Sequence, residues 1–526
     1  MRVIRAFSHE AVAAAGIAAL AAVLRLWKIG AAPRALQYDE ALNGLVVLDL
    51  LRGDLPPLIV QPGGRESLIF YLQAVSVSLL GRTPGALRLP TALASIALAV
   101  GVYLAARELF GRRAGLLAGF LCATTLWPAY LGRLGTRPVL LPSVLAFALF
   151  AAVRAWNGSR RWWALAGVLF GLAHYTYSPN VFILPAFGVT VAYIAVWRRD
   201  VLRRRWKEMS LAAGVAVGVA LPILLFRFTQ GDAVARAAEV AVFYAGQSVP
   251  DFLRTVFSQT YLVLRMFLLK GDLNPRHNIP GRPVFDILMG LPFLVGLYVS
   301  WMRRYRRRAL FCLGWMTVFL LPSFLSKDAP HFLRASGILP VLFVWPALGL
   351  AWSWKQIAVR YGHAIASALV GGLLLLSIAR TTKDYLIDDY LDAPNVLAAF
   401  GGKDAALALQ INTILQIGWE GDNLTAHPLP SYVDRVVLID RELWQADLYA
   451  KYLVPIVPDQ ESYFRLLPDR GPLPYTQAWV LLPAGRLSGF VSDAPAAVEL
   501  TTLPEEAYAT SHGSSIFVIV EWSPRE

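Results

Sequence analysis

Long apolar runs, separated by short polar and arginine-rich segments, fill the first 380 residues of the chain. Eleven runs are 16–20 residues long, close to the ~20 residues that a helix needs to cross the hydrocarbon layer of a membrane. They cover residues 9–28, 91–110, 114–131, 139–156, 162–177, 181–197, 209–226, 283–301, 309–325, 338–354 and 364–380. The pattern predicts a polytopic α-helical membrane protein with about 11 transmembrane helices.

The predicted orientation of the chain in the membrane depends on whether a shorter apolar run, at residues 67–80, crosses it. A helix of this length spans about 21 Å, which is short for a hydrocarbon layer of about 30 Å. If the run lies in the interface as an amphipathic helix, every basic cluster falls on the cytoplasmic side, as the positive-inside rule requires. These clusters are Arg2/Arg5, Arg112-Arg113, Arg160-Arg161, the runs 198–207 and 303–308, and Lys355/Arg360. We therefore expect a retained first helix, a cytoplasmic N-terminus and an external C-terminus.

The last 146 residues differ in composition from the rest. From position 381 onward the chain has 20 acidic and 9 basic residues, net −11, whereas residues 1–380 carry a net charge of +25. Helix-like residues 396–417 and strand-like runs at 436–439, 479–482 and 515–521 predict a small α/β domain. We predict a membrane domain, 1–380, and a soluble extracytoplasmic domain, 381–526. The membrane domain would expose four external loops, at residues 29–90, 132–138, 227–282 and 326–337.

Composition excludes several classes of protein. With 56% hydrophobic and 16% charged residues and a mean hydropathy of +0.51, the chain is too apolar for a set of soluble domains. The net charge of +14 does not indicate nucleic-acid binding, because the arginines flank apolar helices. Cys122 and Cys312 both lie inside apolar runs, so they predict neither a disulfide framework nor a metal site.

Two carboxylates, Asp39 and Glu40, follow the first apolar helix directly. Charged groups beside a membrane are costly unless they serve a function, which makes both candidates for catalysis. The alternative is that they stabilise a helix N-terminus, where a negative charge contributes up to about 1 kcal/mol.

Basic residues occur in the other three external loops. Arg133 and Arg137 lie in the very short second loop, Arg276 and His277 in the third, and His331 and Arg334 in the fourth. Guanidinium groups on the outer side of a membrane could bind an anionic phosphate, or could reach outward to lipid head groups. Each histidine could equally be structural, and no further His or Cys stands beside it at the spacing of metal ligands.

Several short strings in the first 340 residues together resemble a known family. These strings are Tyr38-Asp39-Glu40, Gly63-Gly64-Arg65-Glu66, Tyr71-Leu72-Gln73-Ala74, Ala86-Leu87-Arg88-Leu89-Pro90, Arg107-Glu108-Leu109-Phe110-Gly111 and Gly132-Arg133. In order and spacing they resemble the N-terminal half of the GT-C membrane glycosyltransferases. The resemblance is strongest to bacterial relatives of the protein O-mannosyltransferases and to the lipid A aminoarabinose transferase.

The resemblance implies a reaction. A sugar would pass from a polyprenyl-phosphate donor to a glycan, lipid or protein acceptor at the outer face of the cell membrane, with inversion at the anomeric carbon. Asp39 would be the catalytic acidic residue, acting as general base on the acceptor hydroxyl or, as in some branches of the family, helping to hold a divalent ion. Many members carry another acidic residue in the second loop, where this chain has Arg137-Pro138. We therefore expect transfer without a metal or other cofactor.

The resemblance and the loop charges together predict the remaining site residues. Arg133, Arg137, Arg276, His277, His331 and Arg334 would contact the donor phosphate, and Tyr38, Arg65, Glu66 and Asn274 would line the substrate cavity. Partners would be the lipid-linked donor, the acceptor and membrane lipids, without nucleic acid.

Two other functions fit parts of the same pattern. A transporter or flippase of lipid-linked substrates would need ionisable residues at mid-membrane, and the predicted spans contain almost none. A catalytically inactive partner that kept the fold would explain the missing second acidic residue, although Asp39 and Glu40 are retained.

Overall fold

The computed structural model describes most of the chain. Described are residues 2–33, 35–54, 66–158, 160–230, 240–244, 246–387, 396, 399–400, 405–430, 435–467, 477–492, 498–502 and 517–524. The chain divides into two compact units, each held together by its own internal contacts. Unit 1 comprises residues 1–27, 56–69 and 91–388, and unit 2 comprises residues 28–55, 70–90 and 389–526.

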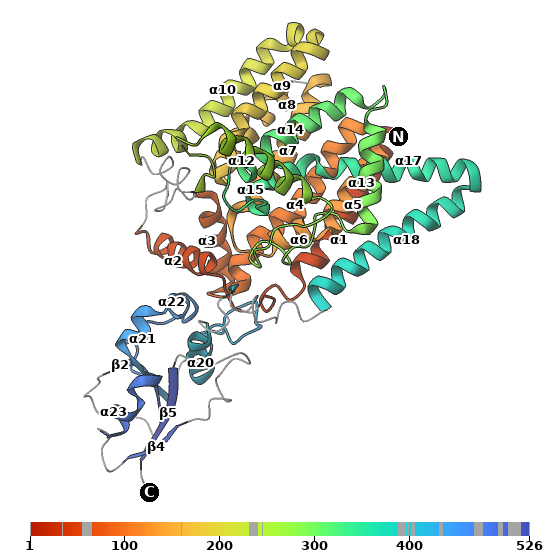
Figure 1. The fold of residues 1–526 in the computed structure, drawn as a ribbon. Helices are drawn as coiled ribbons and strands as arrows, with labels where there is room; N and C mark the ends of the chain where they lie inside the picture. The colour runs from red at the N-terminus through yellow and green to blue at the C-terminus, as the bar shows by residue number, and fades with distance from the viewer. Residues whose placement is uncertain are drawn as a thin grey trace. The chain divides into compact units, whose positions relative to one another are not determined.

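Unit 1 is a helical bundle (Figure 1). Within the described ranges, seven helical stretches are long and apolar enough to cross a membrane, or eight if one bent pair forms a single span. The seven contain α1 (Arg2–Leu26), α4 (Pro84–Phe110), α7 (Leu140–Asn157), α9 (Ile183–Trp197), α10 (Arg199–Gln230), α17 (Val344–Tyr361) and α18 (His363–Thr382). The bent pair is α5 (Arg112–Thr124) and α6 (Leu126–Gly132), which meet at 57°. The predicted polytopic helical fold is confirmed.

Three predicted spans form helices that do not meet this criterion. They are α8 (Arg160–Leu172), α13 (Ile287–Ser300) and α14 (Arg306–Phe324), with 13, 14 and 19 residues. The number of 11 spans and the orientation of the chain therefore stay predictions. The run at 67–80 does form a short helix, α3 (Leu68–Leu80).

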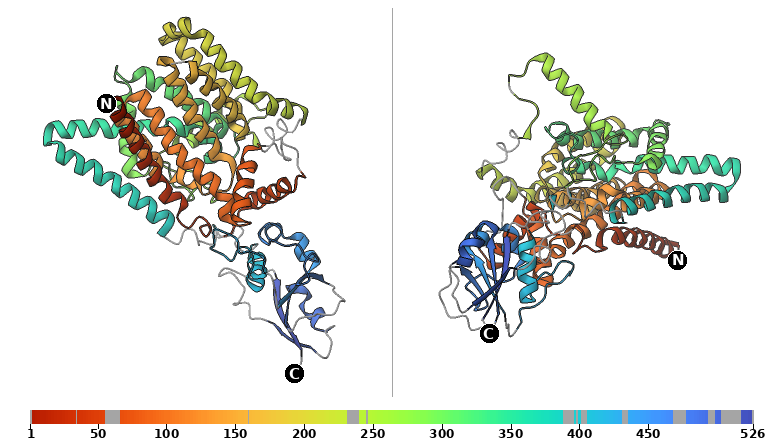
Figure 2. Two further views of the ribbon diagram at one scale, coloured as in Figure 1. Left: turned by 180° about the vertical axis from the view of Figure 1, so that it is seen from behind. Right: turned by 60° about the horizontal axis from the view of Figure 1, so that its bottom comes forward.

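Close backbone approach holds the centre of unit 1 together. The helices α13 and α17 cross at Gly296 and Gly349, and a Cβ atom at Gly296 would lie only 1.7 Å from the carbonyl oxygen of Trp345. Small residues at such a crossing allow tight van der Waals packing inside a membrane. Helix α18 runs along the outside of the bundle (Figure 2), and only 11% of its apolar window is buried, as a lipid-facing helix requires.

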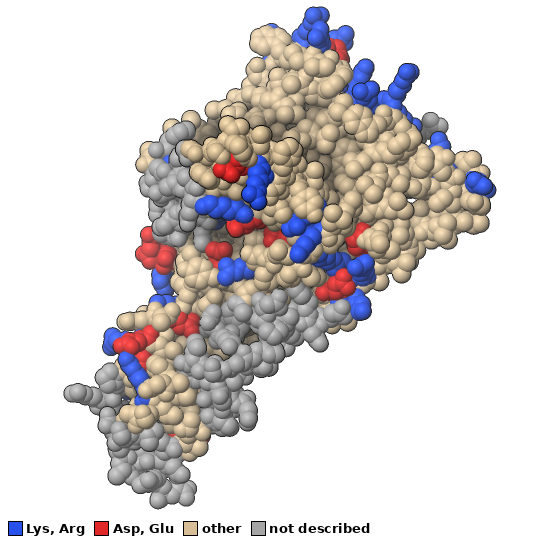
Figure 3. Space-filling view, in the orientation of Figure 1, with Lys and Arg blue, Asp and Glu red and all other residues tan. Residues whose placement is uncertain are grey.

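Charged side chains are unevenly distributed over unit 1. Figure 3 shows Lys and Arg along the upper and right-hand rim, over the ends of α9 and α10 and the turn between α17 and α18, with a broad uncharged surface between this rim and the lower charged residues. The rim matches the basic clusters that the positive-inside rule groups together.

Unit 2 contains a five-stranded mixed sheet in the order β2-β1-β3-β5-β4. The strands are β1 (Arg435–Asp440), β2 (Phe464–Leu467), β3 (Gln477–Pro483), β4 (Val498–Thr502) and β5 (Phe517–Pro524). β1 pairs in parallel with β2 and β3, and β5 pairs antiparallel with β3 and β4. The three predicted strands and the small α/β domain are confirmed, while β2 and β4 were not predicted. The described helix in the predicted range 396–417 is α20 (Ala406–Leu415).

Alternation along the strands builds the core of this sheet. Val436 and Leu438 on β1 lie beside Val480 on β3 in one buried cluster, against which Leu487 and Phe490 of α23 (Leu487–Ser492) pack. The remaining described helices of the tail are α21 (Arg441–Ala446) and α22 (Leu448–Leu453).

Part of the first predicted external loop belongs to unit 2. Helix α2 (Tyr38–Arg52) packs on α22, where a Cβ atom at Gly44 would lie 2.5 Å from the ring of Tyr452. The Arg82 guanidinium donates to the Val454 carbonyl at 2.9 Å, and the Thr83 hydroxyl donates to the Leu424 carbonyl at 2.8 Å. The helix that carries Asp39 is therefore held by the C-terminal domain.

Candidate functional site

Residues from three predicted external loops meet inside unit 1. The Glu66 carboxylate is fully buried and forms ion pairs with Arg137, at 2.9 Å, and with Arg227, at 2.5 Å. Both arginine side chains are about one-eighth exposed. Two guanidinium groups around one carboxylate leave a net positive charge in a poorly solvated place, which suits an anion.

The same cluster adjoins an apolar cavity. Arg227 donates to the Asn180 side chain at 3.2 Å, and Asn180 in turn donates to the His174 carbonyl at 3.1 Å. Asn180 and His174 both line a cavity of about 430 Å³ whose other lining residues come mainly from α7, α8, α9, α10 and α14 and are almost all apolar. A volume of this size is typical of small-molecule sites.

Arg133 is placed differently from Arg137. Its guanidinium is fully buried and donates to the carbonyls of Leu24, Arg25 and Trp27, the last at 2.7 Å. These carbonyls lie at the C-terminal end of α1, where backbone acceptors lack partners within the helix. One guanidinium nitrogen makes all three contacts and supports the end of α1, and the phosphate contact of Arg133 stays a prediction.

Asp39 and Glu40 are neighbours in the chain, but their side chains have different surroundings. Both lie in the first turn of α2, and Glu40 completes a capping box by accepting from the Gln37 amide at 2.8 Å. The two Glu40 oxygens further accept from Arg88, at 2.9 and 3.0 Å, and neither side chain is exposed. These are the contacts of a buried structural anion, and the catalytic role of Glu40 stays a prediction. Asp39, one position earlier, is half-buried.

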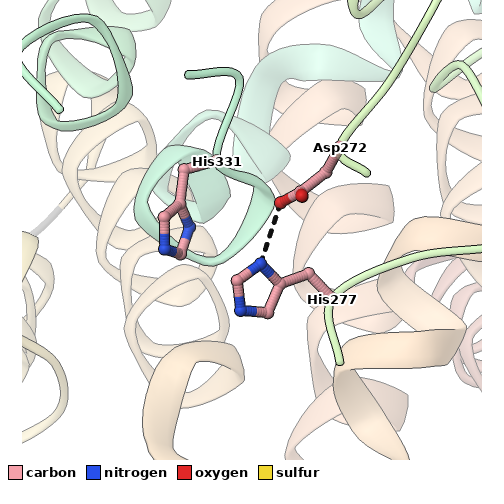
Figure 4. A group of neighbouring side chains, drawn as sticks. All are labelled: Asp272, His277 and His331. Atoms are coloured by element: carbon pink, nitrogen blue, oxygen red, sulfur yellow. Dashed lines mark hydrogen bonds and ion pairs between the residues drawn. The ribbon is translucent and has the colours of Figure 1, made fainter. Parts of the chain in front are cut away.

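A second polar cluster in unit 1 joins the third and fourth loops (Figure 4). His277 Nδ1 lies 2.9 Å from an Asp272 carboxylate oxygen, and the rings of His277 and His331 stack with centroids 4.5 Å apart. All three residues are at most 9% exposed. Burial, together with the nearby His277 and Arg334, lowers the pKa of His331 well below its usual value, so this imidazole is neutral at pH 7.

The other predicted site residues lie apart from these contacts. Arg276 is half-buried, and its guanidinium has no hydrogen-bond or ion-pair partner in the described part of the chain. Arg334 donates to the Ser326 hydroxyl, Asn274 is exposed and accepts from the Arg276 amide at 2.9 Å, and Tyr38 is 52% exposed. Arg65 lies outside the described residues.

Part of the chain matches a known protein family by sequence. Residues 66–226 match the family model described as dolichyl-phosphate-mannose-protein mannosyltransferase. No curated protein matches the chain by sequence.

Solved structures resemble the chain over nearly its whole length. ArnT from Cupriavidus metallidurans, bound to undecaprenyl phosphate, superposes with a TM-score of 0.54 at 14% identity, over 96% of this chain and 97% of ArnT. The chain has the GT-C fold. The oligosaccharyltransferase of Archaeoglobus fulgidus with a tethered acceptor peptide matches this GT-C chain with a TM-score of 0.52 at 16% identity, over 87% of the chain and 63% of the archaeal protein. The resemblance predicted from the sequence is confirmed at the level of the fold, and the chain is a multi-pass membrane protein.

Several residues of the GT-C chain were missed as candidates from sequence alone. Arg227 lies directly after the predicted span 209–226 and is the first residue of the third predicted external loop. Arg133 and Arg137 are likewise arginines in a predicted external loop next to a span, so the same reasoning could have found Arg227. Asn180 lies in the short turn between the predicted spans 162–177 and 181–197. Counting spans from a cytoplasmic N-terminus predicts that this turn is external, like the loops that carry Arg133 and Arg227. Asp272 begins the polar part of the third loop, and nothing in the local pattern linked it to His331, 59 residues later.

Proposed function

We propose that the GT-C chain transfers a sugar from a polyprenyl-phosphate donor to an acceptor at the outer face of the membrane, with inversion. The observation that carries this proposal is the cluster of Arg137, Arg227 and Glu66 beside the apolar cavity of unit 1. A donor of this class has the same two parts, an anionic phosphate and a long apolar chain.

The charges of the cluster suit the leaving group. Arg137 and Arg227 would donate to phosphate oxygens as negative charge grows there, and guanidinium groups fixed beforehand are effective at such stabilisation. Glu66 orients both guanidinium groups in the absence of a ligand. Arg276, whose guanidinium has no partner among the described residues, is a further candidate for the phosphate.

The reaction also needs a base for the acceptor. In our proposal, the acceptor hydroxyl oxygen bonds to the anomeric carbon while the bond from that carbon to the phosphate oxygen breaks, and Asp39 takes the hydroxyl proton. Lipid phosphate leaves as an anion, so little acid catalysis is required. Because Glu40 is fully engaged with Arg88, Asp39 is the carboxylate of this pair that we assign to the base.

Transfer without a catalytic metal follows from the same assignment. The second loop carries Arg137-Pro138 where a second acidic ligand would be needed. Turnover in buffer free of Mg²⁺ and Mn²⁺ should equal turnover with either ion added. If turnover depended on added Mg²⁺ or Mn²⁺, the assignment of Asp39 as a base would be wrong.

The proposal is tested by what the protein makes and what it binds. Mass spectrometry of membrane glycolipids and secreted glycoproteins should show a sugar modification that disappears without the chain and returns with it. Purified chain should bind undecaprenyl phosphate, and a variant with Leu184→Trp in the apolar cavity should bind it more weakly. An unchanged glycan profile together with no binding of the lipid phosphate would contradict the proposal.

A further inference from the structure

We propose that Asp272, His277 and His331 form a zinc site that fastens the third external loop to the fourth. The proposal concerns a metal site separate from the reaction at Asp39, and it does not depend on the transfer reaction. Their ligand atoms all lie within 4.8 Å of one another, and no other such group of three occurs in the described part of the chain.

The backbone around each ligand is held in place by hydrogen bonds. One Asp272 oxygen accepts from the Asn274 amide and the other from the Phe332 amide, both at 2.9 Å. The His331 amide donates to the Ser323 hydroxyl at 2.8 Å. Outer hydrogen bonds of this kind fix the orientation of metal ligands, and here they come from both sides of the cluster.

The spacing of the donor atoms suits a small ion. Zinc bonds of 2.0–2.2 Å in a tetrahedral site place neighbouring ligand atoms about 3.3 Å apart. The 2.9 Å between Asp272 and His277 and the limit of 4.8 Å for the group bracket that distance. Small rotations of the side chains, rather than a change of backbone, would bring all three onto one ion.

The charges also call for a cation. Asp272 is 4% exposed, and its only ion-pair partner among the described residues is His277. A buried carboxylate without a cation is costly. The His331 ring stacks beside the pair, and its Nδ1 accepts from the Arg334 amide at 3.4 Å, so its Nε2 would be the ligand atom. With Asp272 and His277, this second imidazole would complete a set of three metal ligands.

The chemical types of the three ligands indicate which metal ion the site would bind. Two imidazoles and one carboxylate are typical ligands of Zn²⁺, whereas Ca²⁺ and Mg²⁺ prefer oxygen ligands only. With three protein ligands, the fourth position would be open to water or to an anion. The site would link Asp272 and His277, which follow α12 (Val249–Arg265), to His331, which precedes α15 (Phe332–Ala335).

The test measures zinc in the full-length chain, purified in detergent without a histidine tag. Wild-type protein equilibrated with micromolar Zn²⁺ and then dialysed should retain about one zinc per chain, and His277→Ala and His331→Ala should each retain less than about one-fifth of that. His363→Ala, which changes an exposed histidine of the same unit, is the matched control and should keep its zinc. Co²⁺ in place of zinc should give the visible absorption of a tetrahedral N/O site in wild type only.

Thermal unfolding provides a readout that does not require the variants to be as stable as wild type. Adding zinc to metal-free wild type should raise its midpoint temperature by about 5 °C, while the midpoint of His331→Gln should not change. The proposal is overturned if wild type binds no zinc at micromolar concentration, or if the cluster variants retain as much zinc as His363→Ala.

Discussion

Glu40 and Arg88 form a two-pronged ion pair in which neither side chain is exposed to solvent. Arg88 also donates to the carbonyls of Pro33, at 2.7 Å, and Ala35, at 2.5 Å. The pair therefore joins the start of α2 to the start of α4 and to the segment before α2. It fixes the first turn of α2, where Asp39 lies.

Breaking this pair should destabilise the protein strongly. Glu40→Gln leaves the Arg88 guanidinium buried without its counter-ion, and such a loss costs about 3–5 kcal/mol. Asp49→Asn on the same helix removes the exposed pair with Arg52 and should cost no more than about 1 kcal/mol. Thermal unfolding in detergent compares the two variants, and equal midpoints would contradict a structural role for Glu40.

Loss of the proposed base should affect the reaction and not the fold. Asp39→Asn keeps the size of the side chain but removes the proton acceptor, so transfer should fall by about 10²–10⁴-fold. Asp49→Asn is again the control, since it removes a carboxylate from the same helix away from its first turn. The midpoint of unfolding should be close to that of wild type, and undiminished turnover would rule out Asp39 as the base.

The arginine cluster should be sensitive to the shape of the cation as well as its charge. Arg137→Lys and Arg227→Lys keep the charge but lose the planar fork, so we expect transfer to fall about tenfold to a hundredfold. Arg205→Lys, which changes a partly exposed pair with Glu208, should have no effect. Binding of undecaprenyl phosphate should weaken in parallel with transfer, and variants with full activity would remove these arginines from the phosphate site.

The contact between α2 and α22 should tie activity to the C-terminal domain. Gly44→Ala introduces a Cβ atom 2.5 Å from the Tyr452 ring, and overpacking of this kind costs about 1–3 kcal/mol. Gly489→Ala in the same unit has open space around it and should be neutral. Unfolding midpoints and transfer rates should both drop for Gly44→Ala, and a neutral result would show that the ring moves aside freely.

The helices and strands were predictable because they follow from local runs of apolar residues. Apolar runs of sufficient length become helices because lipid offers no partners for backbone amides and carbonyls. All eleven predicted runs contain helix in the structure, and the strands at 436–439 and 479–482 follow from short apolar runs that are buried along most of their length. The predicted helix at 396–417 is shorter where described, since propensity alone sets boundaries poorly.

Residue types alone did not separate the roles of similar side chains. Arg133 and Arg137 are four positions apart in one short loop, yet the first caps the end of α1 and the second pairs with Glu66. The difference depends on which helix end or carboxylate lies within reach of each guanidinium. Glu40 and Asp39 differ in a similar way, because Glu40 is buried in an ion pair with Arg88 whereas Asp39 is half-buried.

The sequence by itself determined the apolar helices and the small sheet-forming tail, because these depend on neighbouring residues and on the lipid solvent. That the four loops share one side of the membrane stays a prediction from the loop charges. Tertiary structure alone decided that Glu66, Arg137 and Arg227 meet, and that Asp272 and His277 lie against His331. These residues are separated by about 60–160 positions, apart from the local pair Asp272 and His277. Their approach is set by how the helices pack at close crossings such as Gly296 with Gly349, and that packing energy is spread over many contacts far from the charged groups.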